Sequence, residues 1–408
     1  MNEWSVERLY TTQSNRIEAK DQAYYDALYA SSRKRLDELR AASPLNDSID
    51  IPDTLAREGL DRRDFMKWVS ATTATLMLPA MFEPLVAEAA ELFNRVPVIW
   101  TNLQDCAGNS EAILRTSAPS IDELILEVIS LEFHEVLMAA AGHQAEKQLE
   151  EAMHTFKGRY ILAVEGSIPL GMDGQYGTKG PHAETMLDHL KRLAADSMAI
   201  VAMGSCAAFG GVPAAYPNPT NAVGVKDVVS GKPIINLSGC PVHPHNITST
   251  IIHVILTGQV PALDNLLRPR FAYGYRIHDN CERRAHFDAG HFVEEFGDFG
   301  AKNNWCLYKV GCKGPMTFNN CSIIRFNDGA NWPVGVGRGC IGCAEPDFWD
   351  KYAHERPVAG VVKKGPLGGV ERSVDMFGLG LLTAVGIGIA VHATASVLAG
   401  KKDEGETK

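Results

Sequence analysis

The segment "AIVAMGSC", residues 199–206, decides the fold class, because it is an apolar run that ends in glycine, serine and a cysteine. Short apolar runs bounded by turn-forming residues are typical of strands that are buried in a parallel sheet. The same pattern recurs in three other places, at "VPVIW" (96–100), "RYILAVEGSIP" (159–169) and "KPIINLSGCP" (232–241).

Two longer stretches lie between these runs. Residues 120–142, "SIDELILEVISLEFHEVLMAAAG", and residues 182–196, "HAETMLDHLKRLAAD", carry apolar residues at helical spacing. Alternation of strands with helices predicts an α/β domain with a flavodoxin-like open parallel sheet, here from residue 96 to residue 275.

Composition narrows the class of protein. A chain of 408 residues is long enough for two or three domains. Its net charge of −10 argues against a nucleic-acid partner, which would favour a basic surface. Nine cysteines cannot all pair into disulfides within one chain. The possible roles that remain for these cysteines are free thiols, intermolecular disulfides and metal ligands.

Three cysteines each follow a predicted strand, at Cys106, Cys206 and Cys240. The carboxyl ends of parallel strands meet at one edge of the sheet, where ligands bind, so we expect these thiols to converge. Small neighbours such as Gly204 and Gly239 would let the backbone approach an inorganic cluster closely. The alternative is three buried thiols that serve only as apolar core.

Residues 276–357 have a different texture, rich in glycine, asparagine, cysteine and aromatic residues and poor in long periodic elements. Such a segment cannot bury a large apolar core, and bound iron–sulfur clusters would supply the missing order. Zinc and disulfides are the competing interpretations. The candidate ligands are His278 and Cys281 in "HDNC", Cys306, Cys312, Cys321, and Cys340 and Cys343 in "CIGC".

Residues 1–95 are interpreted as a leader. In "DRRDFMKW", Arg62 and Arg63 precede Phe65 and a weakly apolar run, and small residues such as Ala89 follow. This order predicts a twin-arginine export signal, a route that carries folded proteins with their cofactors. The alternative is an ordinary buried helix with a basic start.

The C-terminal segment predicts a membrane anchor. Residues 374–400 carry no charge after Asp375 and are long enough to cross a bilayer as a helix. The two lysines that follow place the tail, 401–408, in the cytoplasm and the body on the outer, periplasmic side. Residues 358–373 are then a linker. A buried core helix is the alternative.

These motifs together resemble the small, electron-transferring subunit of membrane-bound nickel–iron uptake hydrogenases. The resemblance covers about three hundred residues. It is carried by "RRDFMK", "PVIW", "GSIP", "GSCAAFGG", "GCPVHPHN", "FAYGYRIHDNCERRAHFDAG", "WCLYKVGCKGP" and "CIGC". It implies a flavodoxin-like domain, a cysteine-rich iron–sulfur domain and a C-terminal transmembrane helix.

The resemblance also implies three clusters in a line. A distal [4Fe–4S] cluster would bind His278, Cys281, Cys306 and Cys312. A medial [3Fe–4S] cluster would bind Cys321, Cys340 and Cys343, with Pro333 near the place of a fourth thiolate. A proximal [4Fe–4S] cluster would bind Cys106, Cys206 and Cys240.

The proximal cluster lacks one thiolate. In the usual family pattern the position of Asn109 is a cysteine. We favour Asp105 as the fourth ligand, since some branches of the family use a carboxylate at this cluster. Asn109 is the alternative, and a solvent ligand or a smaller cluster is also open. An oxygen ligand donates less than a thiolate and would shift the cluster potential.

By the same resemblance, the nickel–iron centre with its cyanide and carbonyl ligands would sit in a separate large subunit and oxidise H2. Electrons would reach a cytochrome b or another quinone-linked acceptor in the membrane, and the complex would be a dimer of heterodimers. Glu111 and Glu165 are either structural acids at the subunit interface or surface carboxylates. Two rivals are a complex I-type quinone-reductase subunit, which would lack the His278–Cys343 region, and an exported zinc or disulfide protein.

Overall fold

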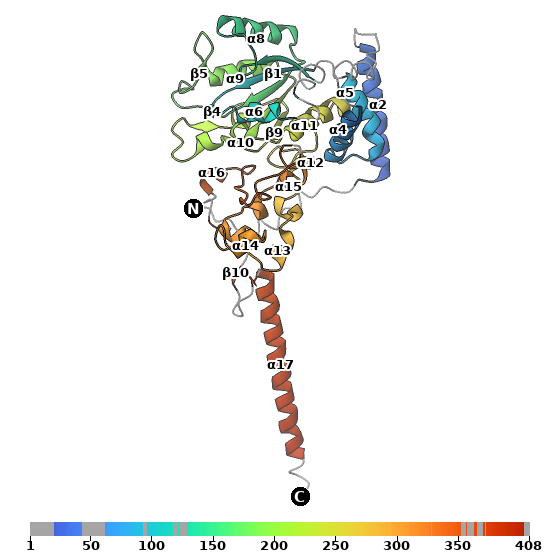
Figure 1. Ribbon diagram of the computed structural model, residues 1–408, viewed down its shortest axis with the longest axis vertical. Helices are drawn as coiled ribbons and strands as arrows, with labels where there is room; N and C mark the ends of the chain where they lie inside the picture. The colour runs from blue at the N-terminus through green and yellow to red at the C-terminus, as the bar shows by residue number, and fades with distance from the viewer. Residues whose placement is uncertain are drawn as a thin grey trace.

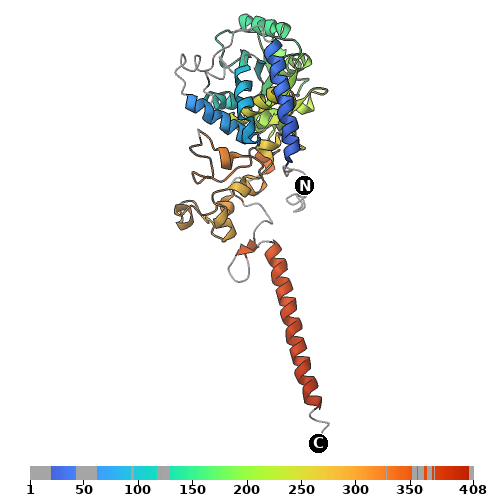
Figure 2. The ribbon, with the colours of Figure 1, turned by 90° about the vertical axis from the view of Figure 1, so that its right-hand side faces the viewer.

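The computed structural model describes residues 20–42, 62–92, 96–116, 121, 129–327, 329–351, 356, 363–364, 370–371 and 373–403. Figure 1 shows three parts stacked along the long axis: an α/β domain, a smaller domain of loops and short helices, and one long helix that projects away from both. A quarter turn about that axis keeps the same order (Figure 2).

A five-stranded parallel sheet forms the centre of the α/β domain. Its strand order is β2-β1-β3-β7-β9, and every neighbouring pair runs parallel. Strands β3, β7 and β9 are buried along their whole length, because helices cover both faces. The predicted α/β class with a parallel sheet is confirmed. The strands are β1 (Val96–Asn102), β2 (Ile129–His134), β3 (Ile161–Glu165), β7 (Ala199–Met203) and β9 (Ile234–Leu237).

Two apolar clusters lie on the opposite faces of the sheet. Helices α8 (His143–Thr155) and α9 (Met186–Ala195) contribute to one cluster, and α11 (Pro244–Thr257) contributes to the other. The helix predicted at 182–196 is α9. It begins after Thr185, whose side-chain oxygen caps the helix by accepting a hydrogen bond from the backbone N–H of Asp188 at 3.0 Å.

Shorter elements surround the sheet. Strand β4 (Ile168–Pro169) pairs with β8 (Ala222–Val223), and β5 (Thr178–Lys179) pairs with β6 (Glu184–Thr185). The short helices of this domain are α6 (Gly108–Leu114), α10 (Gly204–Phe209) and α12 (Arg270–Tyr273).

The helical interpretation of residues 120–142 is wrong in part. Residues 129–134, "ISLEFH", form the edge strand β2, which pairs with β1. Apolar and polar residues alternate here with the period of two that suits a strand. That short alternation lies inside a longer run whose apolar spacing also fits a helix, and pairing with β1 decides between them.

The predicted leader contributes three helices to the fold. These are α2 (Gln22–Ala42), α4 (Arg62–Thr75) and α5 (Glu83–Leu92), which pack against one another and against α11. Leu85 and Val86 of α5 are fully buried in the same cluster as the α11 side chains. Glu88 of α5 forms salt bridges with Arg33 and Arg40 of α2, so these helices are joined by both apolar and ionic contacts.

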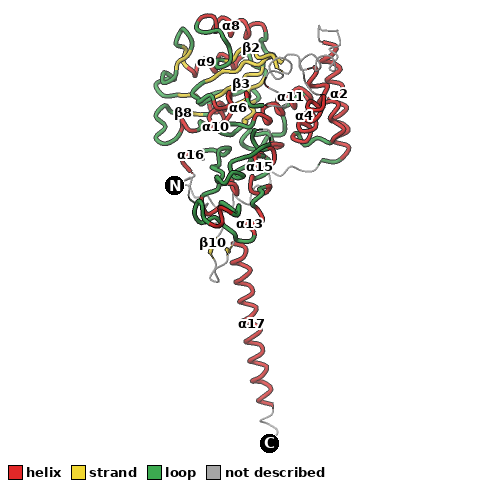
Figure 3. Tube along the Cα trace, viewed as in Figure 1, coloured by secondary structure: helices red, strands yellow, loops and turns green. Residues whose placement is uncertain are grey.

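The smaller domain consists mainly of loops (Figure 3). Its described α-helices have four or five residues each. Cysteines contribute to its buried core beside Ile277, Trp332 and Val334. The helices are α13 (Arg284–Asp288), α14 (Phe299–Lys302), α15 (Cys321–Ile324) and α16 (Phe348–Lys351).

The C-terminal helix α17 (Ser373–Asp403) follows a two-stranded hairpin, β10 (Lys363–Lys364) and β11 (Val370–Glu371). It extends away from the rest of the molecule (Figures 1 and 2). Within the part of the chain that the structure describes, no helix combines the length and apolar character needed to cross a membrane.

Candidate metal centres

The carboxyl edge of the sheet gathers three thiols. Cys106 lies in the loop after β1, Cys206 lies in α10 directly after β7, and Cys240 follows β9. Burial, together with the charges of Cys240 and Cys106, raises the pKa of the Cys206 thiol to about 12. Gly211 leaves room beside this group, because a β-carbon there would contact Cys206 Sγ.

Asn109, the residue at the missing thiolate position, points into the domain and is only 7% exposed. Its Oδ1 accepts a hydrogen bond from the backbone N–H of Val242 at 2.9 Å. Its Nδ2 donates to Glu165 Oε1 at 3.2 Å and to the Met203 carbonyl oxygen at 3.3 Å. A β-carbon on Gly204, whose φ is +80°, would stand 2.5 Å from Nδ2. Both polar atoms of the amide are therefore hydrogen-bonded to neighbouring parts of the sheet edge.

Asp105 is half-buried beside Cys106. Its Oδ2 accepts hydrogen bonds from Asn102 Nδ2 at 2.8 Å and from the backbone N–H of Ala107 at 2.9 Å. Both bonds use the same oxygen, so the carboxylate is held in place while Oδ1 stays available to a ligand.

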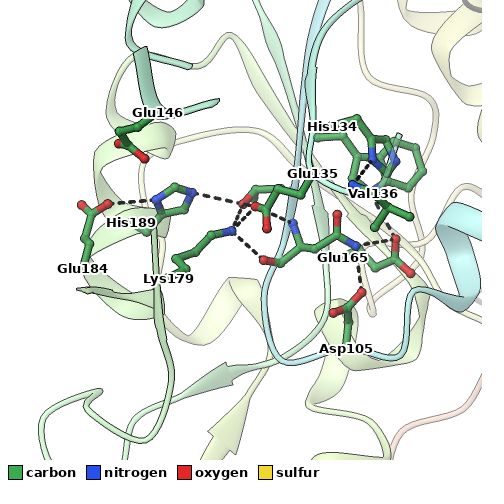
Figure 4. Close-up of polar contacts among 12 residues, drawn as sticks. Asp105, His134, Glu135, Val136, Glu146, Glu165, Lys179, Glu184 and His189 are labelled. Atoms are coloured by element: carbon green, nitrogen blue, oxygen red, sulfur yellow. Dashed lines mark hydrogen bonds and ion pairs between the residues drawn. The ribbon is translucent and has the colours of Figure 1, made fainter. Parts of the chain in front are cut away.

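Glu165 organises the loop that carries these residues (Figure 4). Its Oε1 accepts from the backbone N–H of Asn109 at 2.7 Å and from that residue's side chain. Its Oε2 accepts from the hydroxyl and backbone N–H of Ser110 at 2.6 and 3.0 Å, from Asn102 Nδ2 at 3.2 Å and from Trp100 Nε1 at 3.2 Å. Hydrogen bonds to a charged group are stronger than neutral ones, so this carboxylate is a strong anchor for residues 102–110.

The two acids considered at the sequence level differ in burial. Glu165 is 0% exposed, so it is a buried carboxylate and not a surface one. The run "ILAVE" places it at the last residue of the fully buried β3. Glu111 is on the surface, where it forms an exposed salt bridge with Arg115.

A second polar group, which no motif predicted, lies behind the same loop (Figure 4). Lys179 Nζ donates to the Asn102 carbonyl oxygen at 2.7 Å, to Thr101 Oγ1 at 2.9 Å and to Glu135. Thr101 in turn hydrogen-bonds His189 Nε2 at 3.2 Å. Burial lowers the pKa of Lys179 and lowers that of His189 to about 4, so this histidine is neutral at pH 7.

In the smaller domain, His278, Cys281, Cys306 and Cys312 line one pocket. His278 Nε2 is buried and has no hydrogen-bond partner among the described residues. An orphaned buried nitrogen is costly unless something binds it. Burial lowers the pKa of His278 to about 4, which keeps the imidazole in the neutral form that binds metals. The pocket therefore fits a metal cluster held by three thiolates and one imidazole.

Cys321, Cys340 and Cys343 form the remaining group. Burial raises the pKa of each of the three thiols, and the charge of Cys343 acts on both of the others. Cys340 Sγ lies 3.6 Å from Thr317 Oγ1 and accepts a hydrogen bond from the Gly342 backbone at 3.3 Å.

Pro333, where the resemblance implies a missing thiolate, is exposed between two buried residues. The three groups follow one another in space. At one junction the backbone N–H of Cys340 donates to Cys312 Sγ at 3.3 Å. At the other, the charge of Cys240 acts on the Cys343 thiol. The order is thus the edge group (Cys106, Cys206 and Cys240), then the middle group (Cys321, Cys340 and Cys343), then the pocket group (His278, Cys281, Cys306 and Cys312).

A buried arginine braces the middle group against the α/β domain. Arg268 is 1% exposed and donates from Nε to Asp264 Oδ2 at 2.8 Å. Its Nη1 donates to the Ala344 carbonyl oxygen at 2.9 Å and to Glu345 Oε1 at 3.1 Å. The guanidinium also lies over the Tyr273 ring, 5.2 Å from its centroid.

The cysteines among the possible donor side chains are free thiols. Among the described residues, no three His, Cys, Asp or Glu side chains converge closely enough to hold a single ion. All nine cysteines lie in the described residues, and none is in a disulfide.

Two family models match the chain. One, described as NADH ubiquinone oxidoreductase, 20 Kd subunit, matches residues 106–254. The other matches residues 273–355, the region that a quinone-reductase subunit would lack, and it describes the C-terminal part of the NiFe/NiFeSe hydrogenase small subunit.

Known proteins match over most of the chain. The quinone-reactive Ni/Fe-hydrogenase small chain of Wolinella succinogenes is 53% identical over 86% of this chain and 99% of its own. The uptake hydrogenase small subunit of Azotobacter vinelandii is 43% identical over 87% of this chain and 97% of its own. A crystal structure of the reduced, active Ni-Fe-Se hydrogenase from Desulfomicrobium baculatum has a chain that is 37% identical, with a TM-score of 0.61, and it covers 65% of this chain and 100% of that chain.

Together with the parallel sheet and its ordered thiol groups, this identity shows that the chain belongs to the small-subunit family of nickel–iron hydrogenases.

Proposed function

We propose that this chain carries the electrons of H2 oxidation from a nickel–iron site in a large subunit, through three iron–sulfur clusters, to a membrane acceptor. Membership of the family makes it the electron-transfer subunit of an H2-oxidising hydrogenase and implies that it holds iron–sulfur clusters. The observation that carries the proposal is the sequence of thiol groups, in which the edge, middle and pocket groups adjoin one another.

We assign a [4Fe–4S] cluster to the pocket group, His278, Cys281, Cys306 and Cys312, on the strength of the unpartnered imidazole nitrogen. A [3Fe–4S] cluster is assigned to Cys321, Cys340 and Cys343, because that group offers three thiols. A second [4Fe–4S] cluster is assigned to the edge group. The edge, middle and pocket groups are then the proximal, medial and distal cluster sites. When bound, the clusters supply one-electron redox chemistry, and the chain's own residues bind them, space them and shield them from water.

Asp105 is our choice for the fourth ligand of the edge group, since the Asn109 amide is already satisfied by Val242, Glu165 and Met203. The fixed carboxylate of Asp105 keeps Oδ1 free of the hydrogen bonds that engage Oδ2. Iron accepts such an anionic oxygen more readily than a neutral amide.

Substitution at each position tests this choice. Asp105→Asn keeps the shape but removes the anion, and we expect it to alter the electron paramagnetic resonance (EPR) signal of the proximal cluster. Asn109→Ser serves as the comparison, and we expect it to destabilise the edge without changing the type of ligand. A proximal signal that changes only in the Asn109 variant would make Asn109 the ligand.

The two ends of the relay have different partners in this proposal. Cys106 and Cys240 are exposed at the sheet edge, which suits a surface that a large subunit with its nickel–iron centre covers. The pocket group lies in the domain from which α17 extends (Figure 1), which suits transfer to a cytochrome b or quinone-linked protein. The relative from Wolinella succinogenes is named quinone-reactive. We also propose a dimer of such heterodimers.

We propose export by the twin-arginine route and attachment to the outer, periplasmic side of the cell membrane. Arg62 and Arg63 begin α4, and α17 exposes apolar side chains such as Leu382 and Ile389, at 70% and 65%. Large exposed apolar surfaces mark contact with a membrane or a protein. A chain ending at residue 372 should leave the membrane fraction, and its retention there would contradict the anchor.

Metal analysis tests the whole proposal. Two cubane clusters and one three-iron cluster predict about eleven irons per chain, with matching acid-labile sulfide. Zinc in place of iron would refute it and would favour the exported zinc protein. The quinone-reductase alternative is separated by H2-dependent dye reduction, which only a hydrogenase complex performs.

A further inference from the structure

One buried hydroxyl touches the chain beside ligands of two different cluster sites. Ser205 is 1% exposed and directly precedes Cys206. Its Oγ accepts a hydrogen bond at 3.0 Å from the backbone N–H of Gly239, the residue before Cys240. The same hydroxyl donates to the carbonyl oxygen of Cys343. Ser205 therefore connects two proximal-site loops to one medial-site ligand.

A second contact crosses the same junction. Cys240 and Cys343 approach each other across this junction, because both the charge and the backbone of Cys240 act on the pKa of the Cys343 thiol. The Cys240 and Cys343 ligands are therefore neighbours at this junction. Ser205 holds the backbone next to both ligands, so its hydroxyl controls how closely they approach.

The neighbouring clamps act one residue further along. Ser238 Oγ and Arg268 Nη1 both donate to the carbonyl oxygen of Ala344, at 2.8 and 2.9 Å. Among the described residues, Ser205 alone donates a side-chain hydrogen bond to the Cys343 carbonyl. The local position of this ligand therefore depends on Ser205, while Ser238 and Arg268 hold the loop as a whole.

The next junction, between the middle and pocket groups, is held by other residues. The N–H of Cys340 donates to Cys312 Sγ at 3.3 Å, and the N–H of Lys313 donates to the Cys340 carbonyl oxygen at 2.7 Å. The Thr317 hydroxyl also spans this junction, since it donates to the Lys313 carbonyl oxygen at 2.9 Å and lies 3.6 Å from Cys340 Sγ. None of these contacts involves Ser205. A change at Ser205 should therefore affect the first junction and spare the second.

We propose that Ser205 is a positioning residue that fixes the separation of the proximal and medial cluster sites and so sets the rate at which electrons pass between them. This rests on the cluster assignment proposed above. Oxidation of one H2 gives two protons and two electrons, and the electrons cross singly. In each crossing the proximal site is oxidised by one electron and the medial site is reduced by one. No bond forms or breaks at Ser205, and no proton moves there.

The test uses the complete complex and compares Ser205→Ala with Ser205→Thr, which keeps the hydroxyl. Ser197→Ala is the matched control, because Ser197 is 2% exposed and its hydroxyl donates to the Ala194 carbonyl oxygen at 2.9 Å, outside the junction. EPR at a potential where both sites are paramagnetic measures their magnetic interaction, which weakens as they move apart. Rapid mixing with H2 measures how fast the medial site is reduced.

We expect Ser205→Ala to lose part of the proximal–medial interaction and to slow medial reduction. Ser205→Thr and Ser197→Ala should keep both, and the medial–distal interaction should stay parental throughout. An unchanged interaction in Ser205→Ala at full iron content would overturn the inference and leave the proposed function standing. Absence of iron from the parent complex would instead overturn the proposed function. If Ser205→Ala does not assemble, it is replaced by Ser205→Cys, a weaker donor of similar size. A proximal–medial magnetic interaction equal to that of the unmodified complex in this variant would equally overturn the inference.

Discussion

Arg268 offers the sharpest test of how the two domains are held together. Its guanidinium is buried with two acidic partners, Asp264 and Glu345, and with the Ala344 carbonyl. The change Arg268→Met keeps most of the side-chain volume but removes the charge and every donor. Two carboxylates then remain without their cation, in surroundings where both side chains are largely buried.

The expected loss follows from that burial. Breaking a buried ion pair by removing one partner costs about 3–5 kcal/mol, because the remaining charge is uncompensated. For a domain of this size, 1 kcal/mol corresponds to roughly 2–4 °C in melting temperature, so Arg268→Met should lower it by about 6–20 °C. Arg284 is the matched control. It is 35% exposed and pairs with Asp288 at 3.1 Å, so its replacement by Met should cost only about 0–1 kcal/mol.

The assay is a thermal melt of the purified complex, followed through the visible absorbance of its clusters. Arg268→Lys keeps the charge but loses the several donors of the guanidinium, so its melting temperature should lie between those of the parent and Arg268→Met. Adding Asp264→Asn and Glu345→Gln to Arg268→Met should recover part of the loss, because no unpaired charge remains. A melting temperature of Arg268→Met within about 2 °C of that of Arg284→Met would refute the reasoning.

Three further outcomes are expected. His278→Cys exchanges a neutral ligand for an anionic one, so redox titration should give a more negative potential for the distal cluster, and an unchanged potential would argue against ligation by His278. Glu165→Gln puts an NH2 group opposite buried donors and leaves at least two unsatisfied, at about 1–3 kcal/mol each, so iron analysis should show reduced proximal-cluster occupancy, while Glu111→Gln should not. Burial lowers the pKa of His189 from 6.5 to about 4, so the unfolded chain takes up the proton first and stability falls as pH drops from about 6.5 to about 4. Other buried histidines such as His134 and His243 have the same lowered pKa, so His189→Gln should reduce the slope of the melting temperature over that window without abolishing it. A slope equal to the parent's would exclude this histidine as a contributor.

The fold was predictable where a single segment carries its own signal. The runs that became β1, β3, β7 and β9 are apolar, short and bounded by turn residues, and the carboxyl edge of a parallel sheet follows from them. The strand β2 was not predictable in the same way, since its alternation over 129–134 lies within a run of helical spacing. Only the partner strand resolves that conflict.

The candidate ligands were predictable from spacing, but their supporting residues were not. Glu165 gathers donors from Trp100, Asn102, Asn109 and Ser110, which come together only through the tertiary fold. Nothing local distinguishes Lys179 in "GTKG" from a surface lysine, and Ser205 looks like an ordinary turn residue. The residues that position a site carry weaker sequence signals than the residues that form it.

The helical layer made by α2, α4 and α5 has a consequence for processing of the chain. Leu85 and Val86 share one apolar cluster with Ile247 and Ile252 of α11. Proteolytic removal of the segment before residue 96 would expose that side of α11 to water and create an apolar patch that favours association with other molecules. Maturation and partner assembly must then be timed so that the newly uncovered helix does not meet another unassembled copy first.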